Sequence, residues 1–147
     1  MLTLPMPTMA VISGHCYAAG VFFALGHDMR VMASKKAKFC LSEANIGFAI
    51  PHPGVALCDV TLPPGAIRTL HLGISVSSQE AKEMAIVNNL YEDTADIEQQ
   101  IAQFAETYAP KGAYKSAMKV LKNRIYEEFV DKSQRVAHGP EDVFHLT

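Results

Sequence analysis

The stretch SGHCYAAGVFFALGHDMR, residues 13–30, decides the fold because it joins three small residues to a run of bulky apolar ones. Residues 8–13 are largely apolar and are followed by a glycine, which predicts a short buried strand. Residues 17–25 are apolar on every side and are followed by Gly26, which predicts a buried helix. The sequence therefore predicts a tight strand-to-helix connection built on the small residues 18–20.

Length, charge and cysteine content restrict the class of protein. The 147 residues are 49% apolar, which suits one globular domain. With 13 basic and 15 acidic residues, the chain shows no general attraction to nucleic acid. The three cysteines lack the close pairs of a zinc site or a disulfide framework, so we expect no metal and a reducing, intracellular compartment. No apolar run approaches the roughly 20 residues that cross a bilayer, so we expect no membrane span.

The rest of the chain reads as alternating strands, loops and helices. Two further strands are predicted at residues 28–33 and 38–41. A loop is predicted at 45–54, because prolines and glycines interrupt the pattern there. Hydrophobic periodicity and a cap-like serine predict later helices at 66–72, from 78 onward, at 97–108 and at 113–129. The polar stretch from residue 131 predicts a loosely held tail.

The small residues at 18–20 allow two interpretations. The first backbone N–H groups of a helix have no internal partner, and small side chains let a ligand's carbonyl oxygen approach them. Ala18, Ala19 and Gly20 could then form half of an oxyanion hole. Alternatively, they only let the helix pack tightly against a neighbouring strand, which is the more common reason for such a pattern.

Glu43 is the candidate acid–base residue. It follows the apolar residues 39–41 and precedes residues 46–48, so its carboxyl group is expected to lie among apolar side chains. A poorly solvated carboxyl group is suited to taking up and returning a proton. By itself, the pattern is equally compatible with an exposed glutamate at the end of a strand.

Three segments carry a family pattern: PMPTMAVISGHCYAAGVFFALGHDMRVM (5–32), FCLSEANIGF (39–48) and RTLHLGISVSSQEAKEMAIVNNLY (68–91). In this order they resemble the crotonase (enoyl-CoA hydratase/isomerase) superfamily, and most of all its plant and peroxisomal-type enoyl-CoA delta isomerases. The resemblance implies an α/β fold, the C-terminal part of a crotonase-like ββα spiral with C-terminal amphipathic helices. The implied organisation is a partial domain over 1–130, of which 92–130 form those helices, and a polar tail over 131–147.

The resemblance also assigns roles to the small-residue turn and to Glu43. Family members hold the thioester oxygen of an acyl-CoA with two backbone N–H groups, and one of these falls on Ala19, with Ala18 and Gly20 keeping the turn small. The other would come from a front part of the domain that precedes this chain in the family. Family hydratases use two glutamates, whose positions fall here on Phe22 and Glu43. The resemblance therefore implies an isomerase in which Glu43 alone moves a proton from C2 to C4 of a 3-enoyl-CoA, in the β-oxidation of unsaturated fatty acids.

Further contacts with the substrate follow from the resemblance. Phe22, Phe23 and Phe48 would keep the acyl pocket dry. A basic stripe at helical spacing is formed by Lys115, Lys119 and Lys122. These ammonium groups could contact the phosphates of coenzyme A, although a solvated basic face is the more common reason for such spacing.

The partners implied by the resemblance are an acyl-CoA thioester and further protein chains. No separate cofactor is expected, because coenzyme A is part of the substrate. Homotrimers or assembly with other chains are the family habit, and the compartment would be mitochondrial or peroxisomal. A second hypothesis is a catalytically inactive, crotonase-derived subunit that serves as a structural component of a larger complex.

Overall fold

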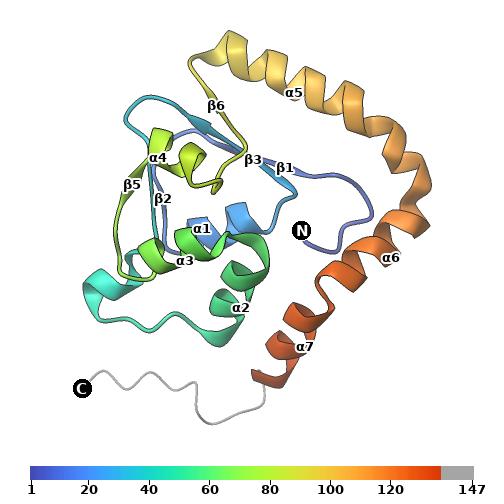
Figure 1. Cartoon of the computed structure of the whole chain (residues 1–147). Helices are drawn as coiled ribbons and strands as arrows, with labels where there is room; N and C mark the ends of the chain where they lie inside the picture. The colour runs from blue at the N-terminus through green and yellow to red at the C-terminus, as the bar shows by residue number, and fades with distance from the viewer. Residues whose placement is uncertain (137–147) are drawn as a thin grey trace.

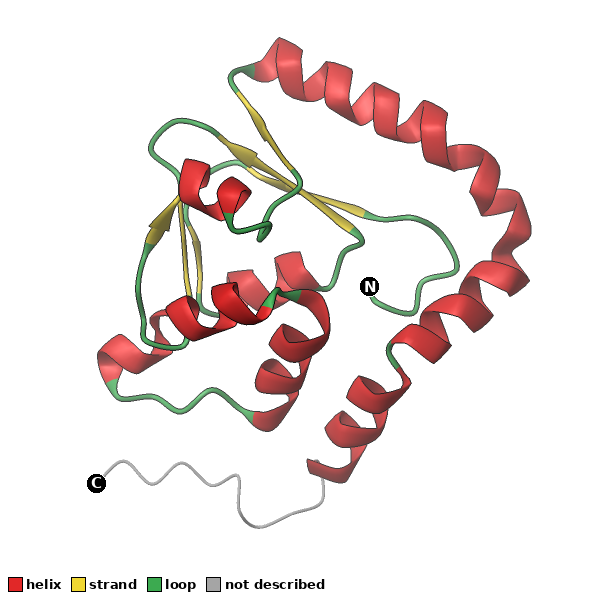
Figure 2. Ribbon diagram, in the orientation of Figure 1, coloured by secondary structure: helices red, strands yellow, loops and turns green. Residues whose placement is uncertain are grey.

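The computed structural model describes residues 1–136, which form two small sheets surrounded by helices and a helical arm at the C-terminal end (Figures 1 and 2). The first sheet has the order β1 (Met9–Ile12), β3 (Met29–Ala33) and β6 (Asn89–Tyr91), and its neighbouring strands are parallel. The second sheet has the order β2 (Cys16–Tyr17), β4 (Lys38–Cys40) and β5 (Val76–Ser77). In this sheet β2 and β4 are parallel, whereas β5 runs antiparallel to β4.

The chain alternates between the two sheets. It passes from β1 to β2, crosses through α1 (Ala19–Leu25) to β3, and then returns to the second sheet at β4. This repeated strand, strand and helix order confirms the predicted α/β spiral. The strands predicted at 28–33 and 38–41 are present but belong to different sheets, and Lys36 in the turn between them has a positive φ of 59°. The two-residue β2 is too short for any alternation to reveal it in the sequence.

The predicted loop at 45–54 is confirmed for residues 47–51 and wrong at both of its ends. Residues Ser42–Ile46 form a short 3-10 helix (η1), and His52–Thr61 form the helix α2. Pro51 is the N-cap of α2 and Pro53 lies in its first turn, where a missing N–H leaves no hydrogen bond unmade. The prolines therefore mark the beginning of a helix, and the irregular segment is short.

The next helices are α3 (Pro64–Leu70) and α4 (Ser78–Glu83). The N-cap of α4 is Ser77, one residue before the predicted cap. Its side chain and that of Glu80 form a reciprocal capping box. The side chain of Ser78 instead donates to the carbonyl oxygen of Ser34 at 2.7 Å, which ties α4 to the end of β3.

The C-terminal arm consists of α5 (Thr94–Tyr108), the 3-10 helix η2 (Ala109–Tyr114), α6 (Lys115–Ile125) and α7 (Glu127–Val136). The predicted helix at 113–129 is thus divided at Tyr126, and α7 continues six residues past the predicted domain end at 130. The part of the predicted tail at 137–147 lies outside the described residues.

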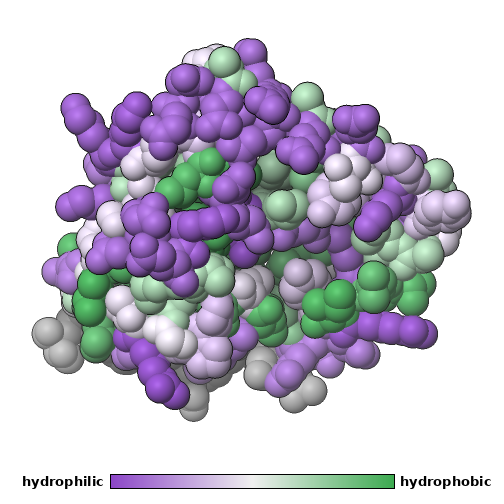
Figure 3. All heavy atoms as spheres, turned by 45° about the horizontal axis from the view of Figure 1, so that its top comes forward, coloured by the Kyte–Doolittle hydropathy of each residue, from purple (hydrophilic) through white to green (hydrophobic). Residues whose placement is uncertain are grey.

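The arm folds back so that α7 packs against α2 (Figure 1). Hydrophilic residues cover most of the face that carries α5, and apolar residues are exposed in patches below it (Figure 3). Within the part of the chain that the structure describes, no helix is long and apolar enough to cross a membrane.

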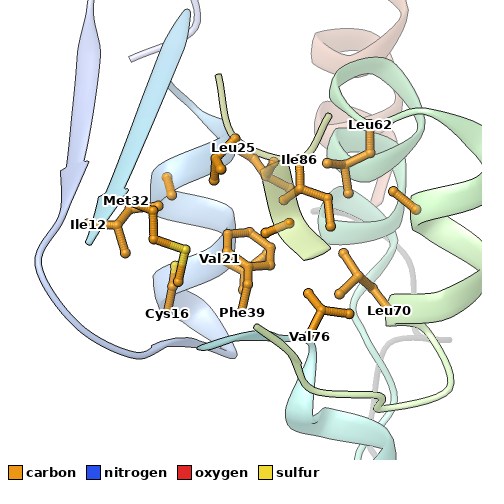
Figure 4. Close-up of a cluster of buried hydrophobic side chains, with 14 of the residues drawn as sticks. Ile12, Cys16, Val21, Leu25, Met32, Phe39, Leu62, Leu70, Val76 and Ile86 are labelled. Atoms are coloured by element: carbon orange, nitrogen blue, oxygen red, sulfur yellow. The ribbon is translucent and has the colours of Figure 1, made fainter. Parts of the chain in front are cut away.

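The hydrophobic core lies between the two sheets and the first three helices (Figure 4). Its labelled side chains come from both sheets and from α1, α3 and the connections between them: Ile12, Cys16, Val21, Leu25, Met32, Phe39, Leu62, Leu70, Val76 and Ile86. Because β2 and β4 contribute Cys16 and Phe39 to this core, the ends of both strands are held in fixed positions.

Candidate active site

The two motifs of the candidate site meet at one edge of the second sheet. Strands β2 and β4 are parallel neighbours, with Tyr17 opposite Cys40. The chain therefore leaves both strands at the same edge, β2 into the small-residue turn and β4 into η1, which carries Glu43. The backbone N–H of Ala18 donates to the carbonyl oxygen of Cys40 at 3.1 Å and ties the turn to the strand that leads to Glu43.

Ala18 has a backbone conformation that favours glycine. Its φ is 49° and its ψ is −122°, at the N-cap of α1. Such a conformation costs a non-glycine residue on the order of 1–3 kcal/mol and persists only where the surrounding structure holds it. Here the N–H of Ala18 bonds to Cys40 and its carbonyl oxygen accepts from the N–H of Val21 at 2.9 Å. The N–H of Ala18 is therefore not available to a ligand.

The N–H groups of Ala19 and Gly20 remain open. Both residues are exposed, and among residues 1–136 neither N–H has a hydrogen-bond acceptor. A Cβ atom built on Gly20 would meet only the Sγ of Cys16, at an ordinary contact distance of 3.9 Å. Packing among the described residues therefore does not require a glycine at this position, which argues against tight packing as the reason for Gly20.

Glu43 is buried, as predicted, and the alternative of an exposed strand-end glutamate is wrong. The residue is 6% exposed. Its Oε2 atom is buried and has no hydrogen-bond partner within the described part of the chain. A buried and unbonded carboxyl oxygen is unusual for a residue with a purely structural role.

The thiols of Cys40 and Cys58 both feel the negative charge of Glu43. Burial raises the pKa of the Cys58 thiol to about 12, with smaller contributions from the negative charges of Asp59 and Glu43. Burial and the charge of Glu43 also raise the pKa of the Cys40 thiol. Cys58 belongs to α2 and Cys40 ends β4, so the charge of Glu43 acts on a thiol of this helix and on a thiol of the second sheet.

Two residues that the sequence analysis did not single out hold η1 in place. The side-chain amide of Asn45 donates to the carbonyl oxygen of Gly73 at 2.9 Å, and the thiol of Cys40 points to the same oxygen at 3.4 Å. Gly73 lies between α3 and β5 and has a φ of 72°. A glycine between a predicted helix and an apolar segment was the only signal in the sequence.

The three phenylalanines lie in different surroundings. The ring of Phe22 is half-buried and lies against α2, since a Cβ on Gly54 would be 3.0 Å from two of its ring atoms. Phe48 is half-buried, and its N–H donates to the carbonyl oxygen of Glu43 at 2.9 Å. Phe23 is 64% exposed and its ring contacts His27, so it does not help to keep a pocket dry. The helix α1 buries one face rather than its whole circumference, which corrects the prediction of burial on every side.

The predicted basic stripe on α6 is divided. Lys115 and Lys119 are exposed, but Lys122 is 4% exposed. Its ammonium group donates to Asp28 at 2.6 Å and to the carbonyl oxygen of Met6 at 2.8 Å. Lys122 is therefore not placed to contact a phosphate of coenzyme A, which corrects the prediction. The buried ammonium group instead holds α6 against the segment before β1.

Comparisons with known proteins agree with this architecture. The family model for enoyl-CoA hydratase/isomerase matches residues 1–147. Enoyl-CoA delta isomerase 3 of Arabidopsis thaliana is 30% identical over 131 residues, which cover 87% of this chain and 55% of that relative. The peroxisomal enoyl-CoA delta isomerase 2 of the same plant is 34% identical over 98 residues, covering 65% of this chain and 41% of that relative.

Solved structures show the same fold. An enoyl-CoA hydratase from Mycobacterium marinum superposes with a TM-score of 0.79 at 21% identity, covering 97% of this chain and 62% of that one. The chain spans about half the length of the curated relatives it matches. The match of the family model to the whole sequence and the shared spiral fold lead to one conclusion: this chain belongs to the crotonase (enoyl-CoA hydratase/isomerase) superfamily.

Proposed function

We propose that this chain acts in an enoyl-CoA delta isomerase, with Glu43 as the proton carrier and the backbone N–H of Ala19 as an oxyanion donor. The observation that carries the proposal is the buried, unbonded carboxyl oxygen of Glu43, at the sheet edge where the N–H of Ala19 is open. The substrate class is an acyl-CoA thioester, with coenzyme A as part of the substrate. The names of the Arabidopsis relatives support the same reaction.

The proposed reaction needs one carboxylate and leaves it unchanged. Glu43 takes a proton from C2 of a 3-enoyl-CoA, and the electron pair of the broken C–H bond spreads onto the thioester oxygen. The N–H of Ala19 stabilises this negative charge, and a donor of this kind contributes about 3 kcal/mol. The protonated Glu43 then returns the proton to C4 as the C3–C4 double bond is replaced by one between C2 and C3.

Phe22 favours isomerisation over hydration. Addition of water across a double bond needs a second carboxyl group to activate the water in the family's hydratases, and that position falls on Phe22. A phenyl ring cannot accept a proton. This ring also packs against Gly54 of α2, so it fills the space that a second acid–base group would need.

Compartment and assembly are part of the proposal. The name of the peroxisomal Arabidopsis relative supports a peroxisomal location. A homotrimer or assembly with other chains is supported by the apolar side chains that α6 leaves exposed: Val120, Leu121 and Ile125.

Product analysis separates the proposed reaction from its alternatives. The full chain is given 3-enoyl-CoA and, separately, 2-enoyl-CoA, and the products are resolved by chromatography. The proposal predicts 2-enoyl-CoA from the first substrate and no 3-hydroxyacyl-CoA from the second. Formation of 3-hydroxyacyl-CoA would identify a hydratase. A folded chain that converts neither substrate, alone or together with its natural partner chains, would favour the inactive structural subunit.

A further inference from the structure

We infer that Asn45 and Gly73 are positioning residues that aim the carboxylate of Glu43 for proton transfer, an inference that rests on the proposed function. Asn45 Nδ2 donates a hydrogen bond to the carbonyl oxygen of Gly73 at 2.9 Å. We call this contact the Asn45–Gly73 latch. Neither residue touches the reacting atoms in this proposal. Both act through the backbone of η1.

The side chain of Glu43 depends on its backbone for its direction. Its Oε2 atom is buried without a hydrogen-bond partner among residues 1–136. An unbonded carboxyl oxygen is free to receive a proton, but no hydrogen bond fixes that oxygen in space. The position of the carboxylate is therefore set by the backbone of η1 and by the side chains packed around it.

One carbonyl oxygen holds η1 from both sides of Glu43. The thiol of Cys40, three residues earlier, lies 3.4 Å from the oxygen of Gly73, and the amide of Asn45, two residues later, lies 2.9 Å from it. Inside the turn, the N–H of Phe48 donates to the carbonyl oxygen of Glu43 at 2.9 Å. η1 is thus stabilised by a hydrogen bond between its own residues and their neighbours, and it is attached to the rest of the fold through the carbonyl oxygen of Gly73.

Gly73 is a fixed point because the segment around it is anchored. Its N–H donates to the carbonyl oxygen of Leu70 at 2.9 Å at the end of α3. The strand β5 then follows and pairs with β4 through Val76 and Phe39. The latch therefore connects η1 to the same sheet that positions the Ala18 turn.

The latch leaves no room for a side chain at Gly73. Its φ of 72° favours glycine, and a Cβ atom there would lie 2.4 Å from Oδ1 of Asn45. This distance is below any van der Waals contact. A substitution at Gly73 must therefore displace the side-chain amide of Asn45 and break the latch.

Kinetics of a double-mutant cycle test the positioning role. Asn45→Ala and Asn45→Asp remove the donor, and Gly73→Ala displaces it. Because a misplacement of about 1 Å can cost roughly 100-fold, we expect kcat to fall about 10- to 100-fold while KM stays within about twofold. The double variant Asn45→Ala with Gly73→Ala should lose less than the product of the single losses, since the clash is gone.

Asn89→Ala is the matched control. Asn89 is also an exposed asparagine whose amide makes a hydrogen bond, to Gln100 at 2.9 Å, but it lies in β6 of the other sheet. Its kcat should equal that of the unsubstituted chain. If Asn45→Ala keeps its kcat within about twofold, or if Asn89→Ala loses as much, the inference is wrong. Should Gly73→Ala fail to fold, the variants of the exposed Asn45 still decide the outcome.

Amide hydrogen exchange gives a readout that does not need activity. The N–H of Phe48 should exchange faster in Asn45→Ala than in the unsubstituted chain, because η1 is less restrained, and should not change in Asn89→Ala. An unchanged exchange rate of the Phe48 N–H in Asn45→Ala would show that the latch does not restrain η1. If the unsubstituted chain shows no isomerase activity, only the proposed function is refuted. Faster exchange of the Phe48 N–H in Asn45→Ala would still show that the latch restrains η1.

Discussion

The N–H of Ala18 and the carbonyl oxygen of Cys40 form a 3.1 Å hydrogen bond that joins the two parts of the candidate site. On one side of this bond the chain turns into α1, with the N–H of Ala19 open. On the other side it enters η1, which carries Glu43. The proposed oxyanion donor and the proposed proton carrier thereby follow directly after two adjacent parallel strands, β2 and β4.

Ala19→Val should reduce turnover much more than stability. Ala19 is exposed at the beginning of α1, and we expect a branched side chain there to crowd a carbonyl oxygen that binds to the N–H of the same residue. Loss of an oxyanion donor costs about 10²- to 10³-fold in kcat, whereas the change in helix propensity costs about 0.5 kcal/mol. Ala95→Val, at an exposed position in the first turn of α5, is the control for propensity. Full activity of Ala19→Val would place the oxyanion donor elsewhere.

Ala18→Gly should leave the free energy of unfolding unchanged or raise it by about 1 kcal/mol. Relief of the positive φ of 49° offsets the greater freedom that glycine gains in the unfolded chain. Ala18→Val should lower the same free energy by about 2 kcal/mol or more, since a β-branched residue is strained further at this φ. Urea unfolding of the two variants gives the comparison. Equal stabilities would show that Ala18 is not strained.

Lys122→Met should destabilise the chain because it leaves the carboxylate of Asp28 without its cation. The ion pair is 2.6 Å long, with side-chain exposures of 5% for Lys122 and 29% for Asp28. Removal of one partner from a fully buried pair costs about 3–5 kcal/mol, so partial exposure of Asp28 reduces the expected loss to about 1–3 kcal/mol. Lys119→Met, on the exposed part of the same helix, should change stability by less than about 0.5 kcal/mol. Urea unfolding measures the stability of both variants. Equal losses in Lys122→Met and Lys119→Met would contradict the structural role of the ion pair between Lys122 and Asp28.

Alkaline pH should weaken the fold through its buried thiols. Burial raises the pKa of the Cys16 thiol from 9.0 to about 11, and that of Cys58 to about 12. Between pH 9 and 11 the unfolded chain loses these protons while the folded chain keeps them, so the free energy of unfolding falls as pH rises. Urea unfolding at pH 8 and pH 10, with Cys16→Ala as the comparison, measures this loss. The free energy of unfolding of Cys16→Ala should fall less between pH 8 and pH 10 than that of the unsubstituted chain. An equal fall in both proteins would contradict the raised pKa of the Cys16 thiol.

The sequence predicted the local parts of the site and not its long-range contacts. The small-residue turn could be found because three small residues stand directly before a run of bulky apolar ones, and Glu43 because it follows a recognisable strand. The latch joins Asn45 to Gly73 across 28 positions, and the ion pair joins Asp28 to Lys122 across 94, so no spacing rule reveals either. The helix α2 was missed because Pro51 and Pro53 were interpreted as breaking a helix, whereas they begin one.

The proton-carrier role of Glu43 is tested most directly by the initial rates at which the unsubstituted chain and Glu43→Gln convert 3-enoyl-CoA into 2-enoyl-CoA. Glutamine keeps the size of the side chain but cannot carry the proton, so we expect conversion by the unsubstituted chain and a loss of about 10²- to 10⁴-fold in the variant. Circular dichroism should show the same folded state for both proteins. A folded Glu43→Gln variant that isomerises at the rate of the unsubstituted chain would contradict the role of Glu43 as proton carrier.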